Sequence, residues 1–160
     1  MSVLVACFGN ALRGDDGLGY AVAQRLQDEP LPAGATVMEV GIGGIHLVQE
    51  LMAGVDVLIV VDAVDLGRPP GTVITQIPDV ADVSLLPIGQ RRDELADMHY
   101  ATPERALMLA RGLGVLPATT LVVGVQTTDT ERVSRQLSAS TAAAVGPVVD
   151  EVRRLVAELL

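Results

Sequence analysis

Short runs of apolar residues alternate along this chain with segments whose apolar residues recur at helical spacing. The run Val3–Phe8 contains no charged side chain and ends at Gly9-Asn10, which is typical of a strand covered on both faces. From Asp16 to about Gln27 the apolar residues recur at helical spacing, and Asp15 precedes them at the position of an N-cap. We therefore expect a strand followed by a helix that Asp15 caps.

The next segments repeat this strand and helix order. Ala35–Val40 predicts a second short strand, and Val57–Val64 predicts a third strand that is the most apolar of all. Between them, Gly41–Gly44 leads into a helix that is expected to bury Ile45, Val48 and Met52. Strands that alternate with helices in this way form a parallel sheet through right-handed crossovers.

The second half of the chain departs from strict alternation. The connection after the third strand is too short for a helix, so Thr72–Pro78 is expected to return antiparallel to that strand. Asp79–Asp97 lacks clear periodicity and is interpreted as a binding loop. Thr102-Pro103 predicts a helix start, Thr119–Gln126 a final strand and Ser138–Leu160 a closing amphipathic helix.

The predicted fold class follows from these elements. We expect residues 1–160 to form a single α/β domain with an open, twisted, five-stranded sheet. The sheet should be mixed but mostly parallel, with helices on both of its faces. No long exposed apolar stripe is evident, so a monomer is expected.

The amino-acid composition disfavours several classes of binding partner. Twenty acidic against eleven basic residues give a formal charge of −9, which would repel nucleic acids and anionic membrane surfaces. No stretch is long and apolar enough to span a bilayer, and the chain reaches Gly14-Asp15-Asp16 without a basic leader. Cys7 is the single cysteine and lies in an apolar run, which favours a buried thiol and a reducing compartment.

Acidic residues follow the carboxyl ends of the predicted parallel strands, where ligands of open α/β sheets bind. Asp15 and Asp16 come after the first strand, and Asp62 interrupts the apolar third strand, where an unpartnered charge would be costly. His99 shortly precedes a helix start, whereas His46 is interpreted as a half-exposed helical side chain. Two carboxylates and one imidazole on separate loops form a donor set for a divalent ion such as nickel or zinc.

Other familiar chemistries find no support in the sequence. The loop Gly9–Gly14 resembles a phosphate loop in spacing, but carboxylates stand where Lys and Ser or Thr are needed. The chain also lacks a G-x-S-x-G nucleophile motif, and Cys7 is predicted to be buried. The reaction class that remains is attack by a water molecule, assisted by carboxylates or by a metal ion.

Five short blocks occur along the chain in a definite order and spacing. They are Gly9-Asn10-x-Leu12-x-Gly14-Asp15-Asp16-Gly17-x-Gly19, Glu39 before Gly41-x-x-Gly44, Val61-Asp62-Ala63-Val64, His99 before a helix, and Gly124-Val125-Gln126. Over nearly the whole chain, this arrangement resembles the hydrogenase maturation endopeptidase family. Asp16 stands where many members of that family have Glu, which shortens the reach of the carboxylate by one methylene.

The resemblance implies a cytoplasmic endopeptidase that removes the C-terminal extension of a nickel–iron hydrogenase large-subunit precursor after nickel insertion. It implies that Asp16, Asp62 and His99 are both the catalytic residues and the metal contacts. The nickel would be carried by the substrate, although another divalent ion could occupy the site in isolation. Substrate- or turn-binding roles are implied for Gly9, Asn10, Asp15, Glu39, Gly41 and Gly44.

Two alternatives from other functional classes remain open at this point. One is a non-catalytic nickel-binding chaperone that uses the same three ligands but cuts nothing. The other is a flavodoxin-like binding protein. Whether the attacking water of an endopeptidase is activated by a carboxylate or by the nickel also remains open.

Overall fold

The computed structural model describes residues 1–96 and 102–160, and its elements follow the predicted order closely. The strands are β1 (Val3–Phe8), β2 (Ala35–Gly41), β3 (Val57–Val64), β4 (Val73–Gln76) and β5 (Thr119–Gln126). The α-helices are α1 (Leu18–Asp28), α2 (Gly44–Met52), α3 (Ile88–Ala96), α4 (Pro103–Gly112) and α5 (Ala139–Leu159). Two short 3₁₀ helices are η1 (Gly14–Gly17) and η2 (Val83–Leu85).

The five strands form one mixed sheet in the order β2-β1-β3-β5-β4. All pairs are parallel except β4 with β5, which confirms the predicted mostly parallel α/β sheet. As expected, the segment Thr72–Pro78 runs antiparallel to the third strand, but β4 pairs with β5, which lies between β3 and β4. The longer and more apolar β5 takes the buried position, whereas the polar end of β4 (Thr75, Gln76) suits the edge.

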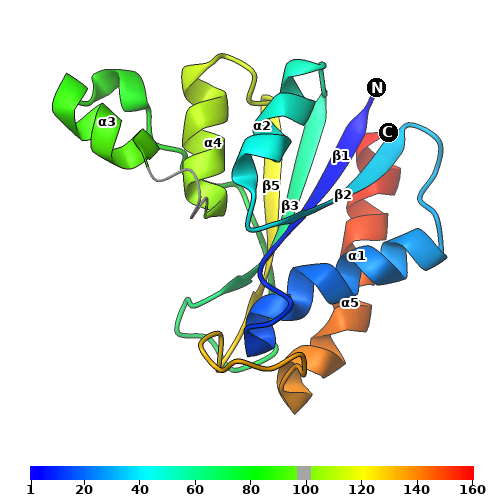
Figure 1. Cartoon of the computed structure of the whole chain (residues 1–160). Helices are drawn as coiled ribbons and strands as arrows, with labels where there is room; N and C mark the ends of the chain where they lie inside the picture. Colours follow the sequence, from blue (N-terminus) through cyan, green and yellow to red (C-terminus); the bar gives the residue numbers. More distant parts are fainter. Residues whose placement is uncertain (97–101) are drawn as a thin grey trace.

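Helices cover both faces of the sheet, as predicted (Figure 1). Every residue of β1 is buried, and its side chains alternate between two cores. One core, under α1 and α5, takes Val3, Val5 and Cys7. The other, under α2 and α4, takes Leu4, Ala6 and Phe8. α3 lies beyond α4, away from the sheet (Figure 1).

The buried face of α2 agrees with the predicted one only at Val48. Ile45 and Met52 are 37% and 64% exposed, whereas the buried residues are Leu47, Val48 and Leu51. Both sets of positions have helical spacing, so periodicity alone does not choose between them. The packing of α2 against the sheet and α4 decides which set is buried.

The segment after β4 is more ordered than expected. Asp79–Asp97 was predicted to be an irregular loop, but its described part contains η2 and α3. Asp82 caps η2 by accepting hydrogen bonds from the amide and hydroxyl of Ser84. Ile88, at the start of α3, is 73% exposed, and a helix that buries so little apolar surface leaves no stripe for periodicity to detect.

The closing helix α5 has 21 residues and contains Pro147. It packs its apolar face on the sheet and on α1, and its buried residues include Val145, Val148, Val152 and Leu155. Within the described ranges, neither α5 nor any other helix has the length and apolar character needed to cross a membrane.

A glycine in the first turn of α1 permits the close approach of this helix to β1. A Cβ atom on Gly19 would lie 1.9 Å from the carbonyl oxygen of Phe8. We expect Gly19→Ala to lower the free energy of unfolding by about 1–3 kcal/mol or more, because the helix must move away from the strand. In α5, a Cβ on Gly146 would meet no atom within 4 Å, so Gly146→Ala should instead stabilise by about 0.5–1 kcal/mol. Urea denaturation of both variants tests this, and equal effects would contradict the packing.

Candidate functional site

A pocket of about 240 Å³ lies at the carboxyl ends of β1 and β3, beside the first residues of α4. Its lining contains five of the residues singled out in the sequence, namely Gly9, Asn10, Asp16, Gly41 and Asp62. Its other lining residues are Phe8, Arg13, Ile42, Thr102 and Pro103. The sheet therefore brings together two carboxylates that lie 46 positions apart in the sequence.

The loop between β1 and α1 holds Asp16 in the pocket. The amide of Asn10 donates a 2.8 Å hydrogen bond to Oδ2 of Asp16. Gly9 has a φ of +123°, and a Cβ at this position would lie 2.0 Å from the carbonyl oxygen of Asp16. The loop can therefore fold back on Asp16 only because residue 9 is glycine.

Asp62 has an unusual protonation equilibrium. Its side chain is half-buried near the end of β3. Burial, followed by the nearby negative charges of Asp16 and Glu104, raises the pKa of Asp62 from 3.8 to about 8, against an opposing hydrogen bond from the Ala63 backbone. Without a cation, this carboxyl group therefore holds its proton at neutral pH. A positive charge in the pocket would favour release of that proton.

Asp15 does not cap the helix that follows it, contrary to expectation. The chain forms η1 before α1, Gly17 is the N-cap of α1, and neither helix start has a side-chain cap hydrogen bond. Asp15 is only 1% exposed and instead accepts hydrogen bonds from segment 127–138. Burial opposes its ionisation, but hydrogen bonds from Ser138, Thr128 and Asp129 outweigh it and hold the pKa of Asp15 below its usual value.

Other predicted residues lie elsewhere. Glu39 is exposed on the edge strand β2, Gly44 is buried at the start of α2, and neither lines the pocket. His46 is exposed on α2, in agreement with a surface role. His99 lies outside the described residues. Within the described ranges 1–96 and 102–160, no three His, Cys, Asp or Glu side chains form a group that could hold a metal ion.

Some lining residues were missed by the sequence analysis. Arg13 lies within the loop that carries Asp16, and its guanidinium forms a 2.5 Å ion pair with Glu131. Thr102 and Pro103 begin α4, so the positive end of that helix lies beside the pocket. Both could have been found in the sequence, because Arg13 is inside the first motif and Thr102-Pro103 follows His99 closely.

A second hollow, of about 370 Å³, adjoins the first and shares Asp62 and Pro103 with it. Its remaining lining residues are Ala63, Val64, Asp65, Leu66, Gln76, Pro78, Asp79, Glu104, Leu107 and Val122. The buried side chain of Gln126, in the last sequence motif, shapes it by accepting a hydrogen bond from the amide of Leu66 and donating one to Asp65. Asp62 therefore lies between two adjoining hollows.

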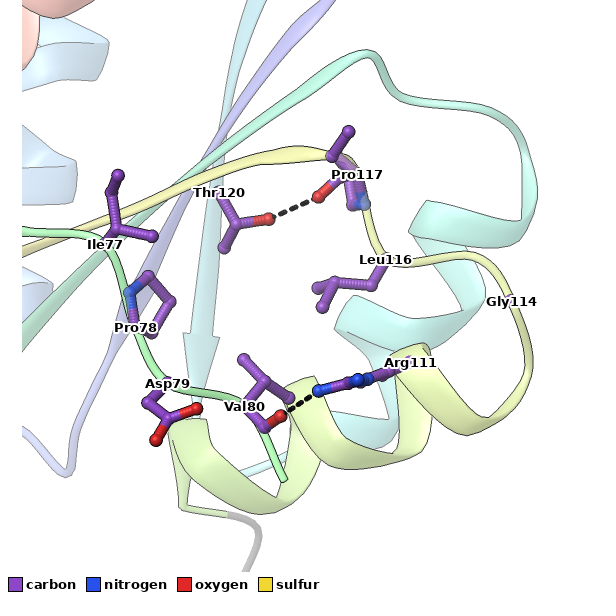
Figure 2. Close-up of a pocket in the computed structure, with 10 residues that line it drawn as sticks. Ile77, Pro78, Asp79, Val80, Arg111, Gly114, Leu116, Pro117 and Thr120 are labelled. Atoms are coloured by element: carbon purple, nitrogen blue, oxygen red, sulfur yellow. Dashed lines mark hydrogen bonds between the residues drawn. The ribbon is translucent and has the colours of Figure 1, made fainter. Parts of the chain in front are cut away.

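A third hollow, of about 390 Å³, lies near the start of β5, at the end of the sheet opposite Asp62. Figure 2 shows that Arg111 points toward Val80, whose carbonyl accepts its hydrogen bond. The hydroxyl of Thr120 donates a 2.8 Å hydrogen bond to the carbonyl of Pro117 (Figure 2). These polar groups hold neighbouring segments together. None of the candidate catalytic, metal-contacting or substrate-binding residues lines this hollow, although Asp79 and Val80, at the start of the expected binding loop, do.

The fold and the pocket define an open α/β protein with paired carboxylates at the carboxyl edge of its sheet. The chain belongs to the hydrogenase maturation protease family, because the model of that family matches residues 20–155. The resemblance inferred from the sequence motifs is thereby confirmed.

Individual relatives agree with this assignment. Hydrogenase expression/formation protein HoxM of Azotobacter vinelandii is 31% identical over 159 residues, which cover 98% of this chain and 73% of HoxM. HupM of Azotobacter chroococcum is 34% identical over 131 residues, 81% of this chain but only 59% of HupM. The chain thus spans about three-fifths of HupM.

Solved structures share the fold. The hydrogenase 2 maturation peptidase from a Thaumarchaeota archaeon superposes with a TM-score of 0.68 at 29% identity, covering 97% of each chain. The hydrogenase maturating endopeptidase HybD from E. coli superposes with a TM-score of 0.76 at 23% identity, covering 99% of this chain and 93% of HybD.

Proposed function

We propose that this protein is an endopeptidase that removes the C-terminal extension of a nickel–iron hydrogenase large-subunit precursor after nickel insertion. Asp16, Asp62 and His99 contact the nickel, which the precursor carries as its recognition element. The reaction takes place in the cytoplasm, where the precursor is assembled.

The observation that best supports a peptide substrate is the position of Asp62 between two adjoining hollows. An endopeptidase must bind chain on both sides of the bond that it cuts. A substrate that enters one hollow and leaves through the other would carry its scissile bond past the Asp62 carboxyl group. A chaperone that only receives a metal ion has no need of a second hollow.

The chemistry of the pocket suits a cation brought by the substrate. The pKa of Asp62 is raised by burial and by the charge of Asp16, so a cation that contacts both groups would displace the Asp62 proton and compensate the two carboxylate charges that result. The carboxylates and the metal then position a water beside the scissile carbonyl. The positive end of α4 lies beside the pocket, where it would stabilise negative charge that develops on the carbonyl oxygen of a bound substrate.

A processing assay tests this proposal. The protein is mixed with nickel-loaded and nickel-free precursor, and the product masses are measured. We expect loss of a C-terminal peptide from the nickel-loaded precursor alone. Cleavage of both forms would exclude nickel recognition. Stable nickel binding with no cleavage of a verified cognate precursor would replace the proposal with a metal chaperone.

A further inference from the structure

The Asp15 carboxylate lies at the junction of two segments that are far apart in the sequence. It accepts five hydrogen bonds from segment 127–138. Ser138 donates from its amide at 2.7 Å and from its hydroxyl at 2.9 Å, while Thr128 and the amide of Asp129 donate at 3.3 Å. Ser138 is the N-cap of α5, so the carboxylate also lies at the positive end of that helix.

Backbone contacts join the same two segments. The Asp15 amide donates to the carbonyl of Asp129 at 2.8 Å, and the Gly14 amide donates to the carbonyl of Ser134 at 2.9 Å. The Ser134 amide returns a 2.9 Å bond to the carbonyl of Leu12. Gly14 has a φ of +56°, and a Cβ on it would lie 2.7 Å from the Asp129 carbonyl oxygen. The segments therefore pack backbone against backbone.

Segment 127–138 is in turn attached to the strand that carries Asp62. The amide of Thr127 donates a 3.2 Å hydrogen bond to the carbonyl of Val64, at the end of β3. A continuous series of contacts thus runs from Asp15 through Thr128 and Thr127 to β3. Asp16, the next residue along the chain, lines the pocket together with Asp62.

We propose that Asp15 is a positioning residue that fixes the Asp16 carboxylate relative to Asp62 by holding loop 9–17 against segment 127–138. Asp15 itself does not line the pocket. The predicted effect of Asp15 on catalysis rests on the proposed function, whereas its predicted effect on the position of the Asp16 carboxylate does not. Residues that orient a metal- or substrate-contacting group typically contribute about 10–100-fold to affinity or activity.

The test uses the amide of Asn10, because its hydrogen bond to Asp16 makes its NMR chemical shift a direct reporter of the Asp16 carboxylate. In Asp15→Asn, an NH2 group replaces one of the two carboxylate oxygens and cannot accept the donors that face it, whereas the remaining carbonyl oxygen still can. Each carboxylate oxygen of Asp15 accepts from segment 127–138, so part of the attachment is lost in either orientation of the amide. We expect the Asn10 amide proton to move upfield as its bond to Asp16 weakens. The kcat for precursor cleavage should fall by about 10–100-fold, with little change in KM.

A second variant separates positioning from the loss of a charge. Ser138→Ala keeps the Asp15 charge and removes the hydroxyl that donates to Asp15. That hydroxyl also contacts the hydroxyls of Ser140 and Thr141 within α5, but it makes no cap hydrogen bond to the backbone of the helix. We expect a smaller shift of the Asn10 amide in the same direction. If Asp15→Asn does not fold, this variant decides the question alone.

A matched control lies at the other end of the sheet. Asp56 also accepts hydrogen bonds from the amide and hydroxyl of one serine, Ser2, at 2.7 and 3.0 Å. Asp56→Asn should leave the Asn10 amide unchanged. An unmoved Asn10 amide in folded Asp15→Asn and in Ser138→Ala would overturn the inference. If the wild-type protein cleaves no precursor, the NMR result still tests the positioning role separately.

Discussion

Asp16→Ala, Asp62→Ala and His99→Ala are each expected to abolish processing of the nickel-loaded precursor while leaving the fold largely intact. Loss of a group that contacts the metal and the attacking water typically costs about 10²–10⁴-fold in rate. The fold should survive because Asp16 and Asp62 line an open pocket and are not part of either apolar core.

The measurement is the initial rate of precursor cleavage, with circular dichroism of each variant as a check on folding. His46→Ala is the matched control for His99→Ala, because His46 is exposed on α2 and does not line the pocket. It should retain wild-type activity. Full activity in all three site variants would refute the assigned roles of these residues.

Asp62→Asn is expected to raise the free energy of unfolding at alkaline pH, which is the second large effect. The folded state holds the Asp62 proton up to a pKa of about 8, whereas an unfolded aspartate releases it near 3.8. Between these values the folded state binds more protons, so the Asp62 contribution to stability falls as pH rises and is lowest above pH 8. The full difference corresponds to at most roughly 6 kcal/mol.

Asparagine resembles the protonated acid and does not titrate, so it removes this dependence. Urea denaturation should show a smaller difference between wild type and Asp62→Asn at pH 5 than at pH 8.5, because most of the interval between the two pKa values lies above pH 5. The variant should be clearly more stable at the higher pH. Parallel pH profiles for the two proteins would show that the Asp62 pKa is not raised. A gain in stability together with a loss of processing would identify Asp62 as a residue retained for function at a cost to the fold.

The strands and the main motifs were predictable because their signals are local. Val3–Phe8 and Val57–Val64 are apolar at nearly every position, which occurs when helices cover both faces of a strand. Asp62 was recognisable as unusual within such a strand, and Gly9-Asn10 as the end of the first strand. These conclusions need only the chemistry of neighbouring residues.

Errors arose where burial depends on contacts between distant segments. The face of α2, the position of β4 beside β5, and the helical character of 88–96 are set by what packs against each element. The hydrogen-bond partner of Asp15 could not be predicted either. An aspartate that caps α1 and an aspartate that binds Ser138 look the same in the local sequence.

Residue types and their spacing along the chain were enough to predict the parallel α/β class, the family and the carboxylates at the edge of the sheet. The packing of distant segments was needed to show that Asp16 and Asp62 share one pocket while Glu39 and Gly44 do not line it. It also decided that Asp15 is buried against the start of α5. The physical reason is that the energy of a carboxylate depends on which donors and charges surround it, and most of these come from distant parts of the chain.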